Sequence, residues 1–566
     1  TGFDLDSLTL DGVRSGVLHG RSVTVLGFAR TGVALARFFV DAGARVTIYD
    51  GRLATELADS IAALGGRSVG LLLGPEVDPA NAWRTADLVT TSPSVSPDYP
   101  TTESRLRAAL TVLRSTVATR PGSGPPIVSE PDLVLRLAPG PTIGVTGTKG
   151  KTTTASLAAD LLAADRSHPV ALGGNIGRPL VDLLPELTPE HRVVIELSEL
   201  QLPTLSRGTT VATYTNVTSD HLDRHGTLAA YRAVKRRLAE LVDPDGALVL
   251  NADDPVVASY AALGAGPSLM YRLERPMPGG LGIVDGWIAA AGVERLPLAG
   301  GGAAWTGPGG RIMPAAELAI PGRHNLSNVL AAIGVALLFG VAPDAIREAA
   351  AAFPGVEHRL ELVAEDDGVR YVNDSQGTQP DAVIAALRAF DGPIVLIAGG
   401  RDKDVDLSGL APVVAERAAA VVLIGESAPL LAGLFREAGV ALIERAVSLE
   451  DAVARADALA RAAIAGGPAK EAPQALAKAQ GQGPATVLLS PAAASFDMFV
   501  DYAARGRAFR TAVRRLIAER SAGLQSAGLH SGGTRDVPPH GAGSRGAGEG
   551  STEEAGPSGK TEGRSA

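Results

Sequence analysis

The segment that decides the fold reads Thr142-Ile-Gly-Val-Thr-Gly-Thr-Lys-Gly-Lys-Thr-Thr-Thr154. A β-rich run ends there in a glycine loop, and a lysine and hydroxyl residues open the following helix. Backbone N–H groups of such a loop close on phosphate oxygens, and the N-terminus of the helix adds partial positive charge. The segment therefore predicts a nucleoside triphosphate site in which Lys151 reaches the β- and γ-phosphates and Thr152 binds Mg²⁺.

The loop is shorter than the common phosphate loop. The common pattern, G-x-x-x-x-G-K-[ST], would place its first glycine at Val145, whereas here Gly147 and Gly150 are separated by only two residues. The alternative is an ordinary glycine-rich turn with a chance lysine. We favour phosphate binding, because strand, loop and helix follow one another in the order that it requires.

Length, charge and cysteine content limit the possible classes of protein. At about 150 residues per domain, 566 residues predict three or four domains. A net charge of −9 without a basic block argues against nucleic acid and anionic membranes as partners. The longest apolar run, residues 329–342, is shorter than the roughly 20 residues of a membrane span. With no cysteine and no recognisable secretory signal, we expect a cytoplasmic protein without disulfides.

Predicted strands alternate with alanine-rich helical stretches, which indicates an α/β fold with parallel sheets and helices on both faces. We expect strands at residues 23–28, 45–50, 88–90, 142–147, 192–197, 211–217, 248–251, 394–398, 421–425 and 486–490.

Shifts in composition divide the chain into domains. Residues 116–127 are rich in Pro, Gly, Ser and Thr, which is typical of a linker or exposed loop. A second shift at residues 353–355 precedes a strand-like run at 369–372. Two segments, 465–484 and 521–566, carry too little apolar surface to offset the entropy of ordering. We predict domains at 1–126, 127–354 and 355–520, followed by a disordered tail at 521–566.

The first domain has the pattern of a Rossmann-like nucleotide-binding fold. Its first strand leads into Gly27 and Gly32, in the spacing G-x-x-x-x-G rather than G-x-G-x-x-G, so it is a weak signature for a redox cofactor. Asp50 or Arg52, after the second strand, can meet a ribose or base. Ser92 follows the third strand, at the edge where ligands usually bind, although its hydroxyl can equally cap a helix.

The second domain contains candidates for metal chemistry. Glu196 interrupts an apolar strand, where a carboxylate is costly unless a cation binds it, so Mg²⁺ is a natural partner. The alternative for Glu196 is a strand-end charge in solvent. His221 lies in a dense polar loop and can bind metal or contact a phosphoryl group. Its neighbours Asp220 and Asp223 can simply cap the next helix. Lys235 has the pattern of a solvated helix lysine.

Several separate motifs, in this order, resemble those of the Mur ligase family of peptidoglycan synthesis. They are residues 147–153, 173–177, 196–201, 216–223, 322–328 and His358-Arg359. The resemblance runs from about residue 22 to about residue 517, apart from the segment at 465–484. It implies a Rossmann-like domain for the UDP-sugar, a central phosphate-loop-type ATPase domain, and a C-terminal Rossmann-like α/β domain for ATP and the amino acid.

Within the family, the chain most resembles the ligases that add D-glutamate, because of its first domain and the loop at residues 490–497. The Asp-Asn-Pro-Arg sequence of relatives that add meso-diaminopimelate or lysine is absent. The resemblance implies that ATP phosphorylates the carboxylate of UDP-N-acetylmuramoyl-L-alanine and that the amine of D-glutamate attacks the acyl phosphate. It also implies two Mg²⁺ ions and a monomer.

The resemblance assigns roles to individual residues. Catalysis is implied for Lys151, Glu196, His221 and Lys235. Metal binding is implied for Thr152, Glu196, His221 and Lys235, the lysine as a carbamate. ATP binding is implied for Gly147, Thr148, Lys149, Gly150, Lys151, Thr152, Thr153, Asn325, Asn328, His358, Arg359 and Asp374. UDP-substrate binding is implied for Gly27, Thr31, Asp50, Ser92 and Asn175, and D-glutamate binding for Thr378, Lys403, Ser490 and Phe496.

One motif departs from the family pattern. Where the family has Asn-Asp-Ser-Lys-Ala-Thr-Asn, this chain has Asn373-Asp-Ser-Gln-Gly-Thr-Gln379, so Gln376 replaces a lysine. Loss of that cation is expected to weaken stabilisation of the acyl phosphate or binding of a substrate carboxylate. Our hypothesis is that Arg401 or Lys403 compensates.

Three alternative functions stay open at this point. A folylpolyglutamate synthase-type ligase shares the later domains but does not need the first one. A non-catalytic nucleotide-binding relative is supported only by Gln376. A redox enzyme that uses the first domain leaves the phosphate loop unexplained.

Overall fold

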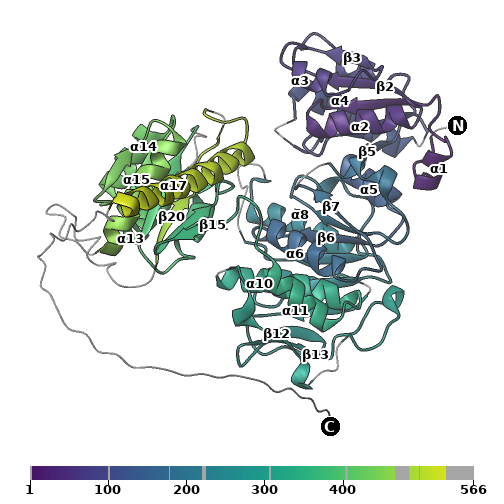
Figure 1. The fold of residues 1–566 in the computed structure, drawn as a ribbon. Helices are drawn as coiled ribbons and strands as arrows, with labels where there is room; N and C mark the ends of the chain where they lie inside the picture. Colours follow the sequence, from purple (N-terminus) through teal and green to yellow (C-terminus); the bar gives the residue numbers. More distant parts are fainter. Residues whose placement is uncertain are drawn as a thin grey trace, which may run out of the picture. The chain divides into compact units, whose positions relative to one another are not determined.

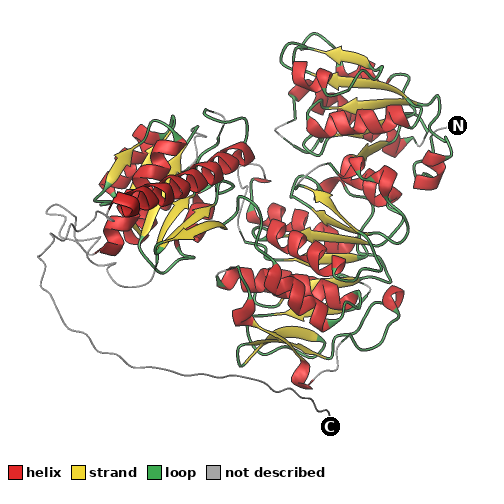
Figure 2. Cartoon of the chain, in the orientation of Figure 1, coloured by secondary structure: helices red, strands yellow, loops and turns green. Residues whose placement is uncertain are grey.

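The computed structural model describes residues 3–99, 102–120, 122–176, 179–218, 225–264, 266–304, 308–320, 322–401, 406–465, 484–495 and 497–530. Its strands form sheets of five, nine and six strands, with helices packed beside the strands (Figure 2). The predicted α/β class is confirmed, with sheets that are parallel or mixed. By contacts, Thr1–Val513 form one compact unit and Arg514–Ala566 a second.

The first sheet is parallel, with the strand order β3-β2-β1-β4-β5. Its strands are β1 (Ser22–Leu26), β2 (Arg45–Asp50), β3 (Gly70–Leu73), β4 (Leu88–Thr91) and β5 (Ile127–Ser129). Its helices are α1 (Leu10–Arg14), α2 (Arg30–Asp41), α3 (Ala58–Ala62) and α4 (Ser104–Thr119). The strand order reverses beside β1, which is the position where open α/β sheets bind ligands.

The predicted linker at residues 116–127 is wrong in its first part. Helix α4 continues to Thr119, because Leu106, Leu110 and Leu113 recur at helical spacing and are buried against the sheet. Only residues 120–126 separate α4 from β5.

The second sheet has the strand order β14-β13-β12-β11-β10-β9-β6-β8-β7. Its strands are β6 (Thr142–Thr146), β7 (Val170–Gly174), β8 (Arg192–Glu196), β9 (Val211–Tyr214), β10 (Ala247–Asn251), β11 (Ser268–Tyr271), β12 (Gly280–Val284), β13 (Trp287–Ala291) and β14 (Arg311–Pro314). Its helices are α5 (Glu130–Leu137), α6 (Lys151–Ala163), α8 (Leu228–Glu240), α9 (Pro255–Ala258), α10 (Arg323–Leu338) and α11 (Pro343–Ala352). Helices α6 and α10 pack against each other (Figure 1), and their buried residues belong to one core.

The third sheet has the strand order β15-β16-β20-β17-β18-β19. Its strands are β15 (Glu361–Asp366), β16 (Val369–Asn373), β17 (Ile394–Gly399), β18 (Ala418–Ile424), β19 (Ile443–Arg445) and β20 (Ala485–Leu489). Its helices are α12 (Pro380–Leu387), α13 (Leu410–Arg417), α14 (Ala428–Glu437), α15 (Leu449–Ala465) and α17 (Tyr502–His530). The predicted disordered tail is therefore wrong for residues 521–530, which are helical. Residues 466–483 and 531–566 lie outside the described residues.

The expectation of parallel sheets is wrong at three strand pairs. Strands β12 and β13 pair antiparallel, as do β13 and β14, and β15 and β16. Two of these pairs, β12–β13 and β15–β16, are hairpins. Both turns are Asp-Gly pairs with positive φ angles, 50° and 77° at Asp285 and Gly286, and 51° and 80° at Asp367 and Gly368. A two-residue turn of this kind matches the twist of antiparallel strands, so these dipeptides produce hairpins.

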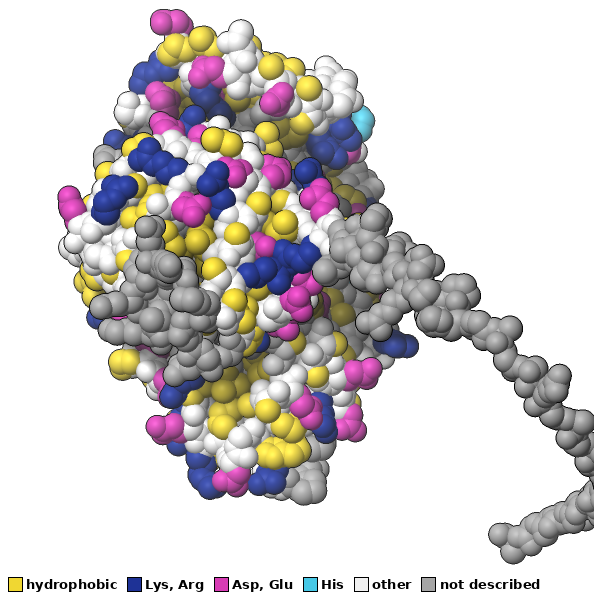
Figure 3. Space-filling view, turned by 60° about the vertical axis from the view of Figure 1, so that its left-hand side comes forward, with side chains coloured by type: hydrophobic (Ala, Val, Ile, Leu, Met, Phe, Trp, Pro, Cys, Tyr) yellow, Lys and Arg dark blue, Asp and Glu magenta, His cyan; other side chains and the backbone are white. Residues whose placement is uncertain are grey.

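Charges of both signs are interspersed with apolar and neutral side chains on the face of the molecule drawn in Figure 3. None of the helices described is both long and apolar enough to span a bilayer.

Glu130 is a buried carboxylate outside the phosphate-binding edge. It is 2% exposed at the start of α5, and it accepts a hydrogen bond from the backbone N–H of Val181 at 3.2 Å. Burial raises the pKa of Glu130 to about 7, although the N–H groups of Val181 and Leu180 act in the opposite direction. The protonated form is therefore favoured in the folded protein, and its stabilising contribution is lost as the pH rises through 7.

Replacing Glu130 by glutamine is expected to remove this pH dependence. Between pH 5 and pH 8 the melting temperature of the variant should rise relative to that of the wild type by about 4 °C, corresponding to ~2–3 kcal/mol. Differential scanning fluorimetry at both pH values measures this difference. The exposed Glu348→Gln is the matched control, and an equal pH response of both variants would contradict the prediction.

Candidate active site

The carboxyl ends of three neighbouring strands bring the phosphate loop, Glu196 and Asn216 together. Strand β6 lies between β8 and β9, and Val145 is paired with Glu196 while Thr146 is paired with Tyr214. Because parallel strands end at the same edge, the residues that follow them must converge. The sequence motifs of the second domain thus form one site.

The phosphate loop requires its glycines. Gly147 has a φ of 148°, and a Cβ there would lie 2.0 Å from Oγ1 of Thr215. Gly150 has a φ of 86° at the N-cap of α6, and a Cβ there would lie 2.3 Å from Oδ1 of Asn328. Only glycine combines these angles with such close neighbours.

Asn216 clamps the loop from the end of β9. Its Oδ1 accepts from the backbone N–H of Lys149 at 3.0 Å, and its Nδ2 donates to the Lys149 carbonyl at 3.0 Å. The N–H of Thr148 donates to the carbonyl of Asn216 at 2.8 Å. Asn216 was part of a predicted polar loop but had no role of its own, because an asparagine after a strand is also typical of an ordinary turn.

Lys151 opens helix α6 and turns back over the loop. Its Nζ donates to the carbonyls of Gly147 at 3.0 Å and Thr148 at 2.9 Å. Burial lowers its pKa, while Glu196 and Glu199 act in the opposite direction. Thr152 and Thr153 follow it in the first turn and are buried. The helix N-terminus and the ammonium group together make this loop suited to phosphate.

Glu196 is buried rather than solvated, so the alternative of a strand-end charge in water is wrong. It is 1% exposed, and its Oε1 accepts from Nδ2 of Asn175 at 2.9 Å. Its Oε2 is buried, and no described residue forms a hydrogen bond with it. A buried carboxylate oxygen without a hydrogen-bond partner fits a cation such as Mg²⁺. Asn175, predicted for the UDP substrate, thus lies beside the predicted metal ligand.

Lys235 is fully buried, so the interpretation of a solvated helix lysine is wrong. Its Nζ donates to the Gly147 carbonyl at 2.9 Å and to Oγ1 of Thr146 at 3.3 Å. The sequence did indicate this burial, because Lys235 shares the apolar face of α8 with Tyr231 and Leu238, which are buried at helical spacing. The side chain thus reaches the same loop as Lys151.

His221, the predicted second metal ligand, lies outside the described residues. Within the described ranges, no group of three or more His, Asp or Glu side chains is placed to hold a metal ion.

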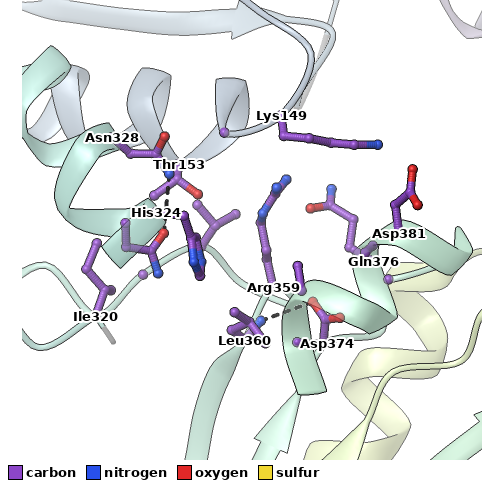
Figure 4. Close-up of a pocket in the computed structure, with 18 of the residues that line it drawn as sticks. Lys149, Thr153, Ile320, His324, Asn328, Arg359, Leu360, Asp374, Gln376 and Asp381 are labelled. Carbon is purple, nitrogen blue, oxygen red and sulfur yellow. Dashed lines mark hydrogen bonds between the residues drawn. The ribbon is translucent and has the colours of Figure 1, made fainter. Parts of the chain in front are cut away.

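A cavity of about 610 Å³ begins at this loop. Its polar lining includes Lys149, Gly150, Thr153, Asn216, Asn325, Asn328, Arg359, Asp374 and Gln376. In Figure 4 the side chains of Lys149, Arg359 and Gln376 point into the same space. Nδ2 of Asn328 donates to Oδ1 of Asn325 at 3.3 Å. Seven of the predicted ATP residues, which come from separate motifs, therefore line one cavity, whereas Gly147, Thr148, Lys151, Thr152 and His358 are not part of its lining.

Arg359 is held between two residues with left-handed backbone conformations. His358 has a φ of 64° and Leu360 a φ of 46°, values that cost free energy in residues other than glycine. His358 is buried behind the cavity, where its Nδ1 lies 3.0 Å from Nδ2 of Asn373. Such strain is typical of functional sites, and here it directs Arg359 into the cavity.

Asp374 links the cavity to the loop after β20. Its Oδ2 accepts from Oγ of Ser490 at 2.6 Å, and its Oδ1 accepts from the N–H of Leu360 at 3.3 Å. Burial raises the pKa of Asp374 to about 6, against the effects of Ser490 and Arg359.

Two of the residues predicted for D-glutamate, Lys403 and Phe496, lie outside the described residues. Thr378 and Ser490 follow β16 and β20, which are neighbours in the sheet. Gln376 lines the cavity, and its Oε1 is buried without a hydrogen-bond partner among the described residues.

Four of the five residues predicted for the UDP substrate, all except Asn175, lie at the ends of strands of the first sheet or at the start of α2. Gly27 follows β1, and its carbonyl accepts from Oγ of Ser92 at 3.3 Å. Asp50 already accepts from the N–H of Phe28 at 2.8 Å and from Nη2 of Arg52 at 2.8 Å. Burial alone would raise its pKa, but these hydrogen bonds hold the pKa below its ordinary value. Thr31 lies in the first turn of α2.

Comparison with known proteins identifies the family. Residues 145–336 match the Mur ligase middle domain, and residues 358–467 match the Mur ligase, glutamate ligase domain. A UDP-N-acetylmuramoylalanine--D-glutamate ligase of Roseiflexus sp. (strain RS-1) is 38% identical over 512 residues, which cover 88% of this chain and 99% of that protein. The chain belongs to the Mur ligase family.

A second relative of this Mur ligase, the UDP-N-acetylmuramoylalanine--D-glutamate ligase of Symbiobacterium thermophilum, is 36% identical, covering 89% of this chain and all of that protein. Among solved structures, MurF from Acinetobacter baumannii is similar with a TM-score of 0.50 and 15% identity, covering 90% of this chain and 98% of that one. That similarity shows a shared fold alone.

Proposed function

We propose that this Mur ligase uses ATP to join D-glutamate to UDP-N-acetylmuramoyl-L-alanine in peptidoglycan synthesis. The observation that carries the proposal is the 38% identity, over nearly their full length, to a relative named for that reaction. The cavity supports it, because Lys149 and Gly150 of the phosphate loop line a single space with Arg359 and Asp374. ATP phosphorylates the L-alanyl carboxylate, and the amine of D-glutamate then displaces phosphate from the acyl phosphate to form the amide.

The residues of this chain would act mainly by positioning and by neutralising charge, as phosphoryl transfer requires. Lys151 and the N–H groups of the loop bind the β- and γ-phosphates. Asn325, Asn328 and Arg359 lie along the same cavity and bind the rest of ATP. His358 acts from behind by holding the backbone that carries Arg359.

Ligases of this family use Mg²⁺, and the donors here fit it. Thr152, Glu196, His221 and Lys235 as a carbamate are the proposed ligands, and the buried oxygen of Glu196 is the observation that supports a cation. When bound, two Mg²⁺ ions would neutralise phosphate charge. Carbamylation would also remove the charge of a lysine that is otherwise buried.

We propose the domain boundaries 1–126, 127–354 and 355–520 for the UDP-sugar, ATPase and amino-acid domains. In support, each range contains the strands of one sheet, except that β5 of the first sheet begins at Ile127. Thr31, Asp50 and Ser92 would bind the UDP substrate.

The experiment is an assay of phosphate release with Mg-ATP and UDP-N-acetylmuramoyl-L-alanine, comparing D-glutamate with L-glutamate, L-lysine and meso-diaminopimelate. Release that depends on D-glutamate, with a product heavier by one glutamyl residue, is expected. Dependence on another amino acid would assign a sibling activity. No release with any amino acid, despite ATP binding, would favour a non-catalytic role.

Replacing Gln376 by lysine, the residue common in the family, is expected to change kcat/KM for D-glutamate by less than about threefold. The cavity already contains the cations of Lys149 and Arg359, so one more positive charge adds little. Steady-state kinetics measure the effect, with Gln379→Lys, three residues along the same segment, as the control. A large rise in turnover for Gln376→Lys alone would show that the missing cation is not compensated.

A further inference from the structure

Among the described residues that are fully buried, Arg505 is the largest. It is 1% exposed and lies in the first turn of α17. Nε donates to Oγ of Ser375 at 3.0 Å, and Nη2 donates to the Ser375 carbonyl at 3.0 Å. Nη1 donates to the carbonyls of Ala493 and Ala494, both at 3.3 Å. A buried guanidinium is costly, so these bonds must compensate for lost hydration.

All of these acceptors are neutral carbonyls or a hydroxyl, so no carboxylate among the described residues accepts a hydrogen bond from Arg505. Burial lowers the pKa of Arg505, while the charges of Asp497 and Asp374 act in the opposite direction. Because two carboxylates already interact with this one charge, what the structure shows of Arg505 is its hydrogen bonds to the surrounding loops.

The loops after three neighbouring strands meet around this guanidinium. The N–H of Ala492 donates to the Gly377 carbonyl at 3.0 Å, which joins the loops after β20 and β16. Arg401 and Ala494 exchange backbone hydrogen bonds of 2.9 and 3.2 Å, which join the loops after β17 and β20. A Cβ at Gly400 would lie 3.2 Å from Nη1 of Arg505. The guanidinium thus touches or adjoins all three loops.

We propose that Arg505 is the positioning residue for the amino-acid substrate. It holds the described parts of the loops after β16, β17 and β20 in the arrangement that receives D-glutamate. A planar group with several donors can join Ser375 to Ala493 and Ala494 at once, which a lysine ammonium cannot do. The inference rests on the proposed function and extends it to a residue that no motif of the sequence indicated.

The test compares Arg505→Lys and Ser375→Ala with the wild type in the full chain. Arg505→Lys keeps a charge but loses the bridge, so KM for D-glutamate should rise about tenfold or more while KM for ATP stays within about twofold. Ser375→Ala removes one acceptor and should raise KM for D-glutamate about threefold. Melting temperatures are measured in parallel.

Arg192→Lys is the matched control. Arg192 is 3% exposed in β8 and donates to the Phe339 carbonyl at 3.3 Å. The substitution therefore removes a buried guanidinium that lies away from the loops around Arg505. It should lower the melting temperature without changing KM for D-glutamate.

Two results would overturn the inference. One is an unchanged KM for D-glutamate in folded Arg505→Lys. The other is a rise of the KM values for D-glutamate and for ATP together, in proportion to the lost stability, which is what a purely structural arginine would give. If Arg505→Lys does not fold, Ser375→Ala decides alone, and an unaltered KM for D-glutamate rejects the inference. A wild type that makes no product with D-glutamate instead rejects the proposed function.

Discussion

Replacing Lys151 by methionine is expected to lower kcat/KM for ATP by about a thousandfold. Methionine keeps the length of the side chain but removes the ammonium that closes over the carbonyls of Gly147 and Thr148. The charge of the β- and γ-phosphates would then lack its nearest side-chain cation. Initial rates of phosphate release at varied ATP concentration measure the loss.

The fold should survive this change, because methionine occupies a partly buried helix start at little cost. The melting temperature is expected to stay within about 2 °C of the wild type. Arg236→Met removes an exposed cation from α8 and should leave activity unchanged, since its partner is Glu240 on the surface of the same helix. Lys151→Met with more than a tenth of wild-type activity would show that the loop binds phosphate mainly through its backbone.

The second large effect is expected for Glu196→Gln. Glutamine has the same shape and its oxygen can still accept from Asn175, but the buried negative charge at Oε2 is lost. We expect kcat/KM to fall by about a thousandfold and the increase in melting temperature caused by Mg-ATP to disappear. Without ligand, the melting temperature should stay within about 2 °C of the wild type, because glutamine keeps the shape and the hydrogen bond from Asn175.

Glu199→Gln provides the control for this variant. It removes another buried carboxylate from the same segment, and it should retain activity within about tenfold because it is not among the proposed ligands. Thermal shift with Mg²⁺ alone, ATP alone and Mg-ATP separates metal binding from nucleotide binding. An undiminished response of Glu196→Gln to Mg-ATP would reject Glu196 as a ligand.

Local chemistry explains which strands the sequence predicted. Strands with continuous apolar runs, such as β17, were predicted because a strand buried along its whole length is apolar throughout. Short edge strands, such as β3 and β19, were missed because they are only partly buried and so lack that signal. The Asp-Gly pairs of the two hairpins are a local turn signal in the sequence, although no hairpin was predicted from them.

The residues of the candidate site also differ in whether the sequence predicted them. Lys151 and Glu196 were predicted from the sequence, because a glycine loop before a helix and a carboxylate inside an apolar strand each have a chemical reason visible along the chain. Lys235 was recognised only through family resemblance, since its burial depends on how α8 packs. Arg505 had no signal at all, because an arginine in a charged helix is ordinary until its surroundings are known.

The sequence by itself determined the α/β class, the phosphate loop and the order of the motifs, because these depend on backbone preferences and side-chain chemistry within a few residues. The tertiary structure alone decided which motifs meet. Strand order placed β8 and β9 on either side of β6, and it placed the loops after β16, β20 and β17 around Arg505. The physical reason is that burial and charge at a site are set by neighbours that are distant in sequence and adjacent only in the folded sheet.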